Sequence, residues 1–429
     1  MELVELAERL WRGEDPGHKS APLGVGAPLG EVADGVAFLP NFANCSIVDT
    51  GDGLVMVDTG SPLSAARVFS EVRAWRDARL SHVVFSHGHI DHVFGVGPFD
   101  EESSARGWPR PTVVAHANLP RRFERYVMTA GYNAVINRRQ FGVENLEWPV
   151  EYRYPDETYE TATSFTLGDD RFELRHEKGE TDDATVTWLA GRGVLFSGDL
   201  FIWNSPNAGN PQKVQRYPKE WAEALRRMAA LGAETLLPGH GLPIFGAARV
   251  RQALTETAEY LEHLVEATLE VMNAGGRLDE ALHSVRPPAH LASRPYLQPY
   301  YDDPEFIVRN VWRLYGGWWD GDPSHLRPAP ERRLAVELCA LAGGPGVLCE
   351  RALALIEEPG EATDRLAGHL VETAWLAAPD DPAIAEARRR VFSTLAQRTT
   401  STMSRGVFTH AAREAARTNG RNGTTLKTD

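Results

Sequence analysis

The sequence has few cysteines and no long apolar run, and each shortage argues against a class of protein. Its 429 residues include three cysteines, Cys45, Cys339 and Cys349, with no CxxC pair among them. Neither a disulfide framework nor a thiolate zinc site is therefore expected. No apolar run approaches the ~20 residues of a transmembrane helix. The N-terminus also lacks the basic start and apolar stretch of a signal peptide. We expect no membrane insertion and a cytoplasmic location.

The sequence also has fewer positively charged than negatively charged residues. Lysine and arginine total 45 against 59 for aspartate and glutamate, so the net charge is −14. A surface this acidic disfavours nonspecific binding to nucleic acid or to an anionic membrane, and we expect no nucleic-acid partner. Hydrophobic residues make up 42% and charged residues 24%, which is an ordinary globular composition. At roughly 150 residues per domain, the length indicates two or three domains.

Strand and helix patterns alternate along the first part of the chain, up to about residue 245. Short apolar runs bounded by Gly, Asn and Pro are typical of strands, and apolar residues at 3.6-residue spacing are typical of helices. The expected strands are 35–40, 44–50, 54–60, 81–86, 111–116, 171–177, 184–190, 193–201 and 235–241. The expected helices are 64–80, 117–145 with a Gly-Tyr-Asn interruption, and about 219–231. This alternation predicts an α/β layered domain.

The character of the sequence changes after residue 246. Residues 247–275 form a long amphipathic pattern, and later segments rich in Ala, Leu, Glu and Arg keep helical spacing between Pro and Gly residues. These segments are about 304–316, 331–342, 346–357, 362–377 and 382–400. We therefore predict four regions: an N-terminal extension at 1–29, an α/β catalytic domain at 30–246, an all-α domain at 247–418 and a disordered tail at 419–429.

The strongest chemical signal is a histidine-rich loop that directly follows a predicted strand. It reads Ser86-His87-Gly88-His89-Ile90-Asp91-His92, with three histidines and one aspartate within six residues. Such a loop can aim imidazoles and a carboxylate at one point. Neutral imidazole nitrogen and carboxylate oxygen are donors that Zn²⁺ prefers. The loop therefore predicts a metal site rather than a solvated polar turn.

This loop resembles the HxHxDH signature of the metallo-β-lactamase superfamily, and further elements of that family occur in order. Upstream lies Val57-Asp58-Thr59-Gly60, similar to the family's strand and DTG turn. Downstream come Lys178-Gly179-Glu180-Thr181, Ser197-Gly198-Asp199 and Pro238-Gly239-His240-Gly241. The resemblance implies an αββα sandwich that holds one or two metals, usually zinc.

The resemblance also implies a role for each residue at two metal positions. His87, His89 and Glu180 would hold the first metal, Asp91, His92 and His240 would hold the second, and Asp199 would bridge the two. Most of the superfamily has His where this chain has Glu180. A carboxylate is still a competent zinc ligand, and its extra charge would favour retaining two metals. His176, four residues earlier, is an alternative third ligand.

Glu180 points to one branch of the superfamily, because alkyl sulfatases resemble this chain at that position. A second match is Tyr315-Gly316-Gly317-Trp318-Trp319-Asp320-Gly321-Asp322-Pro323-Ser324-His325-Leu326, which is similar to a segment of the alkyl sulfatase dimerisation domain. This resemblance implies a homodimer. The sequence departs from the family in two respects. Asp199 stands where those sulfatases have Glu, and the sequence shows no counterpart of their sterol-carrier-like C-terminal domain.

The ligand motifs and the two resemblances together lead to the hypothesis of a hydrolase with two Zn²⁺ ions per subunit. The expected substrate is a small anionic ester, above all a sulfate ester of an aliphatic alcohol. A metal-bound hydroxide would be the nucleophile, with Asp91 and Asp199 as the catalytic carboxylates that offset charge and hold geometry. The alternatives are another ester class on the same metals (a lactone, a thioester or a phosphodiester) and a noncatalytic scaffold that kept the fold.

Three further residues are predicted to support the chemistry. Asp58 is a candidate to orient a metal-binding histidine through its outer N–H, although a turn-capping role in the DTG segment explains it equally well. Lys213 and Arg216 follow Asp199 in a loop expected beside the metals and are candidate anion-binding residues, with a solvated loop as the alternative.

Overall fold

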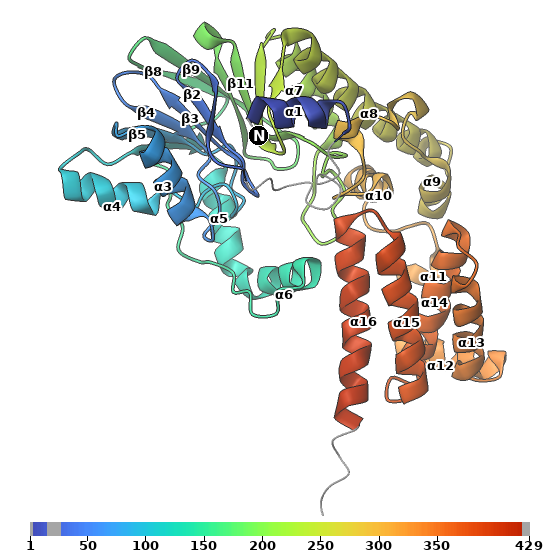
Figure 1. Ribbon diagram of the computed structural model, residues 1–429. Coiled ribbons are helices and arrows are strands. Elements are labelled where there is room, and N and C mark those ends of the chain that lie inside the picture. The colour runs from blue at the N-terminus through green and yellow to red at the C-terminus, as the bar shows by residue number, and fades with distance from the viewer. Residues whose placement is uncertain (1–2, 15–26, 423–429) are drawn as a thin grey trace, which may run out of the picture. The chain divides into compact units, whose positions relative to one another are not determined.

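The structure, a computed structural model, describes residues 3–14 and 27–422, with side chains described as far as Ala416. The chain divides into two compact units. The first contains residues up to 130 together with 148–318, and the second contains 131–147 and the chain from 319 onward. Figure 1 shows the sheets in the first unit and the helical bundle that forms most of the second.

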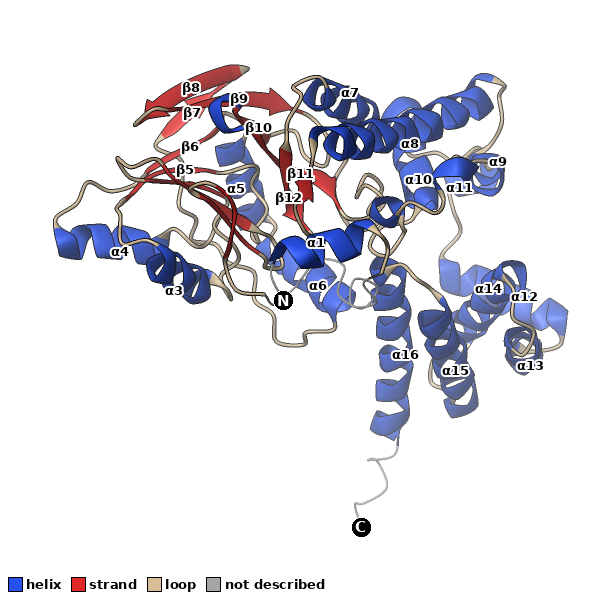
Figure 2. Ribbon diagram, turned by 45° about the horizontal axis from the view of Figure 1, so that its top comes forward, coloured by secondary structure: helices blue, strands red, loops and turns tan. Residues whose placement is uncertain are grey.

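Two β-sheets form the centre of the first unit (Figure 2). The seven-stranded sheet has the order β1(Gly30–Ala33), β2(Val36–Leu39), β3(Cys45–Asp49), β4(Leu54–Val57), β5(Leu80–Val84), β6(Thr112–His116), β7(Glu157–Tyr159). The six-stranded sheet has the order β13(Ile244–Phe245), β12(Thr235–His240), β11(Val194–Ile202), β10(Ala184–Leu189), β9(Asp170–Glu177), β8(Ala162–Leu167). Strands β4 to β7 pair in parallel, as do β11 and β12, and the other pairs are antiparallel.

Both faces of the seven-stranded sheet are buried, because successive residues of a strand point to opposite faces. On β4, Leu54 and Met56 pack into a core with α3(Ala65–Trp75) and α4(Gly97–Arg106). Val55 and Val57 face the other way and join a core that includes the second sheet. The layer order is therefore helix, sheet, sheet, helix, as the predicted αββα sandwich requires.

The outer face of the second sheet is covered by α7(Pro218–Ala229) and α8(Ala247–Asn273). Trp221 on α7 and Leu254 and Leu261 on α8 are fully buried in the same core. Consequently α8, α9(Leu278–Ser284) and α10(Pro304–Gly316) belong to the first unit. The division between compact units follows Trp318, so it does not coincide with the boundary predicted after residue 246.

The second unit is helical. It contains most of α6(Ala130–Phe141) and the helices α11(Pro323–Leu326), α12(Glu331–Ala342), α13(Pro345–Ile356), α14(Glu361–Ala377), α15(Pro382–Arg398) and α16(Thr402–Asn422). A core of small and apolar side chains joins α13 to α16. Helix α12 buries only Ala335 and Cys339, whereas Leu334, Leu338 and Leu341 are exposed. This helix therefore presents an apolar face that its own unit leaves uncovered.

The predicted strands and main helices are confirmed, with small differences at their ends. A short helix, α1(Leu3–Trp11), lies in the N-terminal extension. The helical pattern of 117–145 forms two helices, α5(Leu119–Met128) and α6, which are separated at Thr129, whereas the Gly-Tyr-Asn segment predicted as the interruption lies inside α6. Strands β1, β7, β8 and β13 and helices α4, α9, α11 and α16 were not predicted. Helix α16 extends to residue 422, so the first part of the predicted tail is helical, and 423–429 lie outside the described residues.

No single helix in the described ranges is long and apolar enough to cross a membrane. Helices α12 and α13 pass that test of length and composition only as a pair, and the pair is bent by 84°.

Candidate metal centre

Five chain segments bring the predicted site residues together. The loop that carries His87, His89, Asp91 and His92 follows β5, and Asp58 follows β4. Glu180 follows β9, Asp199 lies within β11, and His240 is the last residue of β12. Parallel strands place their carboxyl ends at one edge of a sheet, which explains why residues far apart in sequence meet here.

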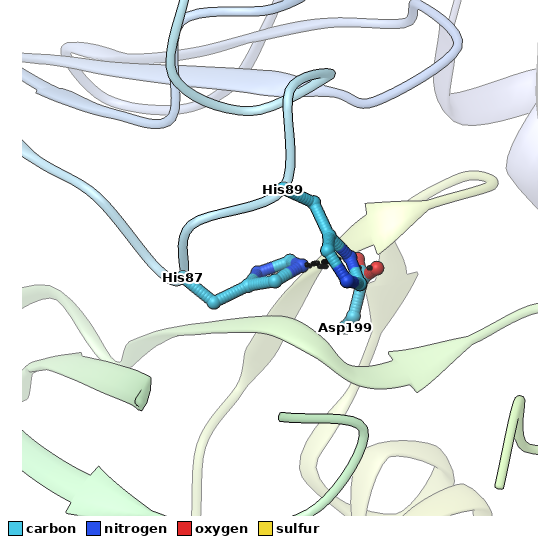
Figure 3. A group of neighbouring side chains, drawn as sticks. All are labelled: His87, His89 and Asp199. Carbon is cyan, nitrogen blue, oxygen red and sulfur yellow. Dashed lines mark hydrogen bonds and ion pairs between the residues drawn. The ribbon is translucent and has the colours of Figure 1, made fainter. Parts of the chain in front are cut away.

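The first group of potential ligands consists of His87, His89 and Asp199, whose ligand atoms all lie within 4.8 Å of one another. His87 Nε2 lies 2.8 Å from His89 Nδ1 and 3.6 Å from Asp199 Oδ2. Figure 3 shows the two imidazoles and the carboxylate converging on one point. All three donors are nitrogen or oxygen atoms of the kind that zinc takes.

The second group consists of Asp91, His92 and His240, which meet the same 4.8 Å criterion. Asp199 contacts this group as well, because its Oδ1 lies 3.4 Å from His92 Nε2 and its Oδ2 lies 3.3 Å from His240 Nε2. Asp199 therefore lies between the two groups, where a bridging ligand would have to be.

Buried polar atoms without hydrogen bonds are a second observation that indicates metal binding by these two groups. His92 Nε2 and Asp199 Oδ1 are buried and lie 3.4 Å apart, and neither makes a hydrogen bond. Leaving buried polar atoms unsatisfied costs roughly 1–3 kcal/mol each, so such atoms call for an explanation. The Gly239 backbone can lie close to the Asp199 carboxylate because glycine has no Cβ, and a Cβ at this position would lie 2.1 Å from Asp199 Oδ1. The donor set and the unsatisfied atoms together indicate a metal centre.

The charges at the centre depend on one another. Burial and the neighbouring His92 lower the pKa of His87 to about 3, so its imidazole is neutral and able to bind metal. Burial acts in the same direction on His92, but the carboxylates of Asp199 and Asp58 outweigh it and raise the His92 pKa. The imidazoles of His240 and His92 hold the pKa of Asp199 well below its usual value against the effect of burial.

Asp58 makes the contact expected of a residue that orients a metal-binding histidine. Its Oδ2 lies 2.8 Å from His92 Nδ1, and it also accepts hydrogen bonds from the hydroxyl and the backbone N–H of Ser86 at 2.7 and 2.8 Å. Among the described non-glycine residues only Asp58 has a positive φ, 58°. The Asp58 carboxylate thus has both predicted contacts: it binds the His92 imidazole, and it caps the turn through Ser86.

Glu180 lies beside the first group but is not one of its three members. Its Oε1 is 3.9 Å from His89 Nδ1, and the residue is buried. The same oxygen lies 3.2 Å from Arg216 Nη2 and accepts a 2.5 Å hydrogen bond from Asn207 Nδ2. Burial raises the pKa of Glu180, and the Arg216 guanidinium opposes that rise.

His176, the alternative third ligand, has other contacts. Its ring stacks on His116 with 3.6 Å between ring centroids, and its Nε2 lies 3.0 Å from the Asp182 carbonyl oxygen. It belongs to neither group of potential ligands.

The two predicted anion-binding residues differ in their surroundings. Arg216 is 2% exposed and is bound to Glu180, with Nη1 donating to the Glu180 carbonyl at 2.6 Å. Two of its guanidinium nitrogens thus bind Glu180, and its anion-binding role stays a prediction. Lys213 is half-buried, with Nζ 5.8 Å from the centre of the Trp148 ring. Burial and the charge of Arg216 lower the pKa of Lys213 to about 8.

Sequence reasoning missed a buried network that holds the histidine loop. The Gly88 N–H donates to Asp183 Oδ2 at 2.9 Å, and Arg122 Nε donates to Asp183 Oδ1 at 2.8 Å. Arg122 also pairs with Asp182. The Asp-Asp pair directly after Lys178-Gly179-Glu180-Thr181 was the available signal, but nothing in the sequence marked Arg122 as its partner.

Two family models match the chain. The metallo-beta-lactamase superfamily model matches residues 39–240, and the alkyl sulfatase dimerisation model matches residues 277–418. The first match contains every predicted metal ligand, and the second begins inside the first compact unit.

Curated relatives and solved structures agree with these models. A linear primary-alkylsulfatase from Pseudomonas sp. is 29% identical over 322 residues, covering 70% of this chain and 60% of the relative. An (R)-specific secondary-alkylsulfatase from Pseudomonas sp. is 23% identical over 342 residues, covering 74% and 52%. The chain thus spans between half and two thirds of the length of these relatives. The structure of the inverting sec-alkylsulfatase Pisa1 from Pseudomonas sp. has the same fold, with a TM-score of 0.81, 22% identity and coverage of 91% and 66%.

Proposed function

Because the chain belongs to the metallo-beta-lactamase superfamily and carries an alkyl sulfatase dimerisation region, we propose that it hydrolyses sulfate esters of aliphatic alcohols with two zinc ions per subunit. The observation that carries the proposal is Asp199, whose carboxylate lies between two groups of nitrogen and oxygen donors. The similarity to relatives described as alkylsulfatases supports the ester class.

The residues that would hold the first metal are His87, His89 and Glu180, and those for the second are Asp91, His92 and His240. A zinc pair supplies a water of lowered pKa and a Lewis acid for the ester. The chain's own groups contribute the rest. Asp199 and Asp91 offset positive charge, and Asp58 holds the proton on His92 Nδ1, so that Nε2 keeps its lone pair toward the site.

Lys213 is the residue proposed to recognise the charged part of the substrate. Its surroundings include the Asp91 and Glu180 carboxylates, which raise its pKa and favour the ammonium. A half-buried ammonium beside the metals is a suitable partner for an ester that carries a negative charge. Arg216 has no such role in this proposal because its guanidinium binds Glu180.

We also propose that the protein is a homodimer that acts in the cytoplasm. The exposed apolar residues of α12 support an interface, since contiguous exposed apolar surface marks association sites. The match to the dimerisation model supports the same assembly.

The test is sulfate release from linear and secondary alkyl sulfates of several chain lengths by zinc-reconstituted protein. Release of sulfate, lost on chelation and restored by zinc, is the expected result. Turnover of a lactone, a thioester or a phosphodiester without any sulfate release would contradict the substrate class while leaving the metal centre standing. No turnover together with zinc binding well below one equivalent would contradict the enzyme proposal altogether.

A further inference from the structure

Glu180 differs from the other potential ligands because two side chains from a distant loop bind the same oxygen. Arg216 Nη2 and Asn207 Nδ2 lie 3.2 and 2.5 Å from Glu180 Oε1. Arg216 Nη1 also holds the Glu180 backbone carbonyl at 2.6 Å. All three residues are at most 5% exposed. A carboxylate buried this deeply needs both charge compensation and hydrogen bonds to stay ionised.

The same contacts fix the direction in which Glu180 points. Two contacts come from the Arg216 guanidinium, one to the side chain and one to the main chain of the same residue. A planar guanidinium with several donors holds its partner in a defined orientation, which a point charge does not. Arg216 and Asn207 therefore constrain both the charge and the position of the proposed third ligand.

Arg216 and Asn207 lie on the connection between β11 and α7, residues 203–217, which has no helix or strand of its own. Long irregular segments keep a fixed shape only where other groups hold them. Here the segment just before and inside α10 does so. Asp302 Oδ2 accepts a 2.7 Å hydrogen bond from the Gly209 N–H, and Asn310 Nδ2 donates to the Arg216 carbonyl at 3.0 Å.

Asn310 makes further contacts with the same loop. Its Oδ1 accepts from Gln215 Nε2 at 2.8 Å and from the Arg216 N–H at 3.4 Å. Asp302 is completely buried. The loop backbone also lies directly against α10, because a Cβ on Gly209 would be 2.1 Å from the Phe306 carbonyl carbon. The connection is thus held along its length by residues 302–310.

We propose that Arg216 and Asn207 are positioning residues for Glu180, and that Asp302, just before α10, and Asn310, on α10, extend this support. It follows that part of the region matched by the dimerisation model, residues 277–418, is needed to build the first metal site. The inference rests on the proposed function insofar as Glu180 binds a metal. It concerns metal affinity, which is measured without any substrate.

The first test is a double-mutant cycle between Glu180→Gln and Arg216→Met, read out as zinc affinity against a chromophoric chelator. Removing such an outer partner of a ligand typically costs ~10- to 100-fold in metal affinity. We expect R216M to cause a loss of this size for one zinc per chain when Glu180 is present, and a much smaller loss in the E180Q background, because the charge it compensates is gone.

The competing role, binding of the substrate anion, gives a different pattern. An R216M variant with unchanged zinc affinity and a raised KM for anionic esters in both backgrounds would overturn the proposal. Arg216→Lys keeps the charge and serves as the variant that folds if R216M does not. Its expected zinc affinity lies between those of the parent and R216M, and its cobalt(II)-loaded form should show a changed visible absorption spectrum, since the ligand geometry changes.

The second test addresses the contribution of α10. Asn310→Ala should weaken zinc binding severalfold, whereas Arg309→Ala, an exposed neighbour on the same helix, should not. Light scattering on both variants separates this effect from dimer formation, and we expect the same mass for both. Parental zinc affinity in a folded N310A variant would overturn the role of α10. A failure to release sulfate by any variant, the parent included, bears only on the proposed substrate.

Discussion

Asp58→Asn is the substitution that probes the second metal position most selectively. Asparagine keeps the size and shape of aspartate and tolerates the positive φ of 58° at this position. Its carbonyl oxygen can still accept the hydrogen bond from the Ser86 N–H. The amide nitrogen, however, would replace the oxygen that lies 2.8 Å from His92 Nδ1. That nitrogen donates, so His92 has to move its proton to Nε2, the atom proposed to bind metal.

The expected loss follows from the strength of the contact. A hydrogen bond to a charged group contributes about 1.5–3 kcal/mol. At about 1.4 kcal/mol for each factor of ten, this corresponds to a roughly 10- to 100-fold weaker second zinc site. The affinity for the other zinc should change less, because Asp58 reaches His87 only through the Ser86 hydroxyl, which lies 2.7 Å from Asp58 Oδ2 and 2.9 Å from His87 Nδ1.

The assay is a zinc titration with a competing chelator, followed by kcat for sulfate release at saturating zinc. Asp52→Asn, which removes an exposed carboxylate six residues away, is the matched control and should behave as the parent. Two zinc sites of parental affinity in a correctly folded D58N protein would refute the orienting role of Asp58.

The remaining predictions concern the ligands, the substrate anion and the dimer. His87→Ala and His240→Ala should each reduce sulfate release at least ~1,000-fold with an unchanged circular dichroism spectrum, and near-parental turnover in either would contradict the ligand assignment. Lys213 has a pKa of about 8 and loses its charge as pH rises through that value, so KM for anionic esters should increase above pH 8. Lys213→Arg should abolish this increase, since arginine stays charged; an identical pH profile in the variant would rule out Lys213. Leu341→Asp on the exposed face of α12 should halve the mass measured by light scattering, and an unchanged mass would place the interface elsewhere.

Much of the fold was predictable because its strands are short, apolar and well separated by turns. The buried strand β11 and the alternating strand β9 both have patterns that follow directly from their burial. Strand β8 was missed because it alternates between exposed and half-buried positions at a sheet edge. Helix α4 was missed because Gly97–Arg106 buries only Phe99 and Ser103, which leaves little apolar periodicity to recognise.

The site was predictable to the extent that its residues are adjacent in sequence or belong to a known motif. The loop from His87 to His92 was predicted as a metal site from its composition, because it has three histidines and one aspartate within six residues. The role of Arg216 could not be predicted in this way, because an arginine beside a buried carboxylate and an arginine beside a substrate anion look the same in sequence. The hydrogen bond from Asn310 to Arg216, in the connection 203–217, spans 94 residues along the chain, and only the folded structure shows it.

The most direct test of the metal centre is anomalous scattering at the zinc edge from crystals of the zinc-reconstituted protein. The account predicts two peaks per chain, one among His87, His89 and Glu180 and one among Asp91, His92 and His240, with Asp199 in contact with both. A single peak away from Asp199, or no peak at all in protein that binds zinc in solution, would contradict it.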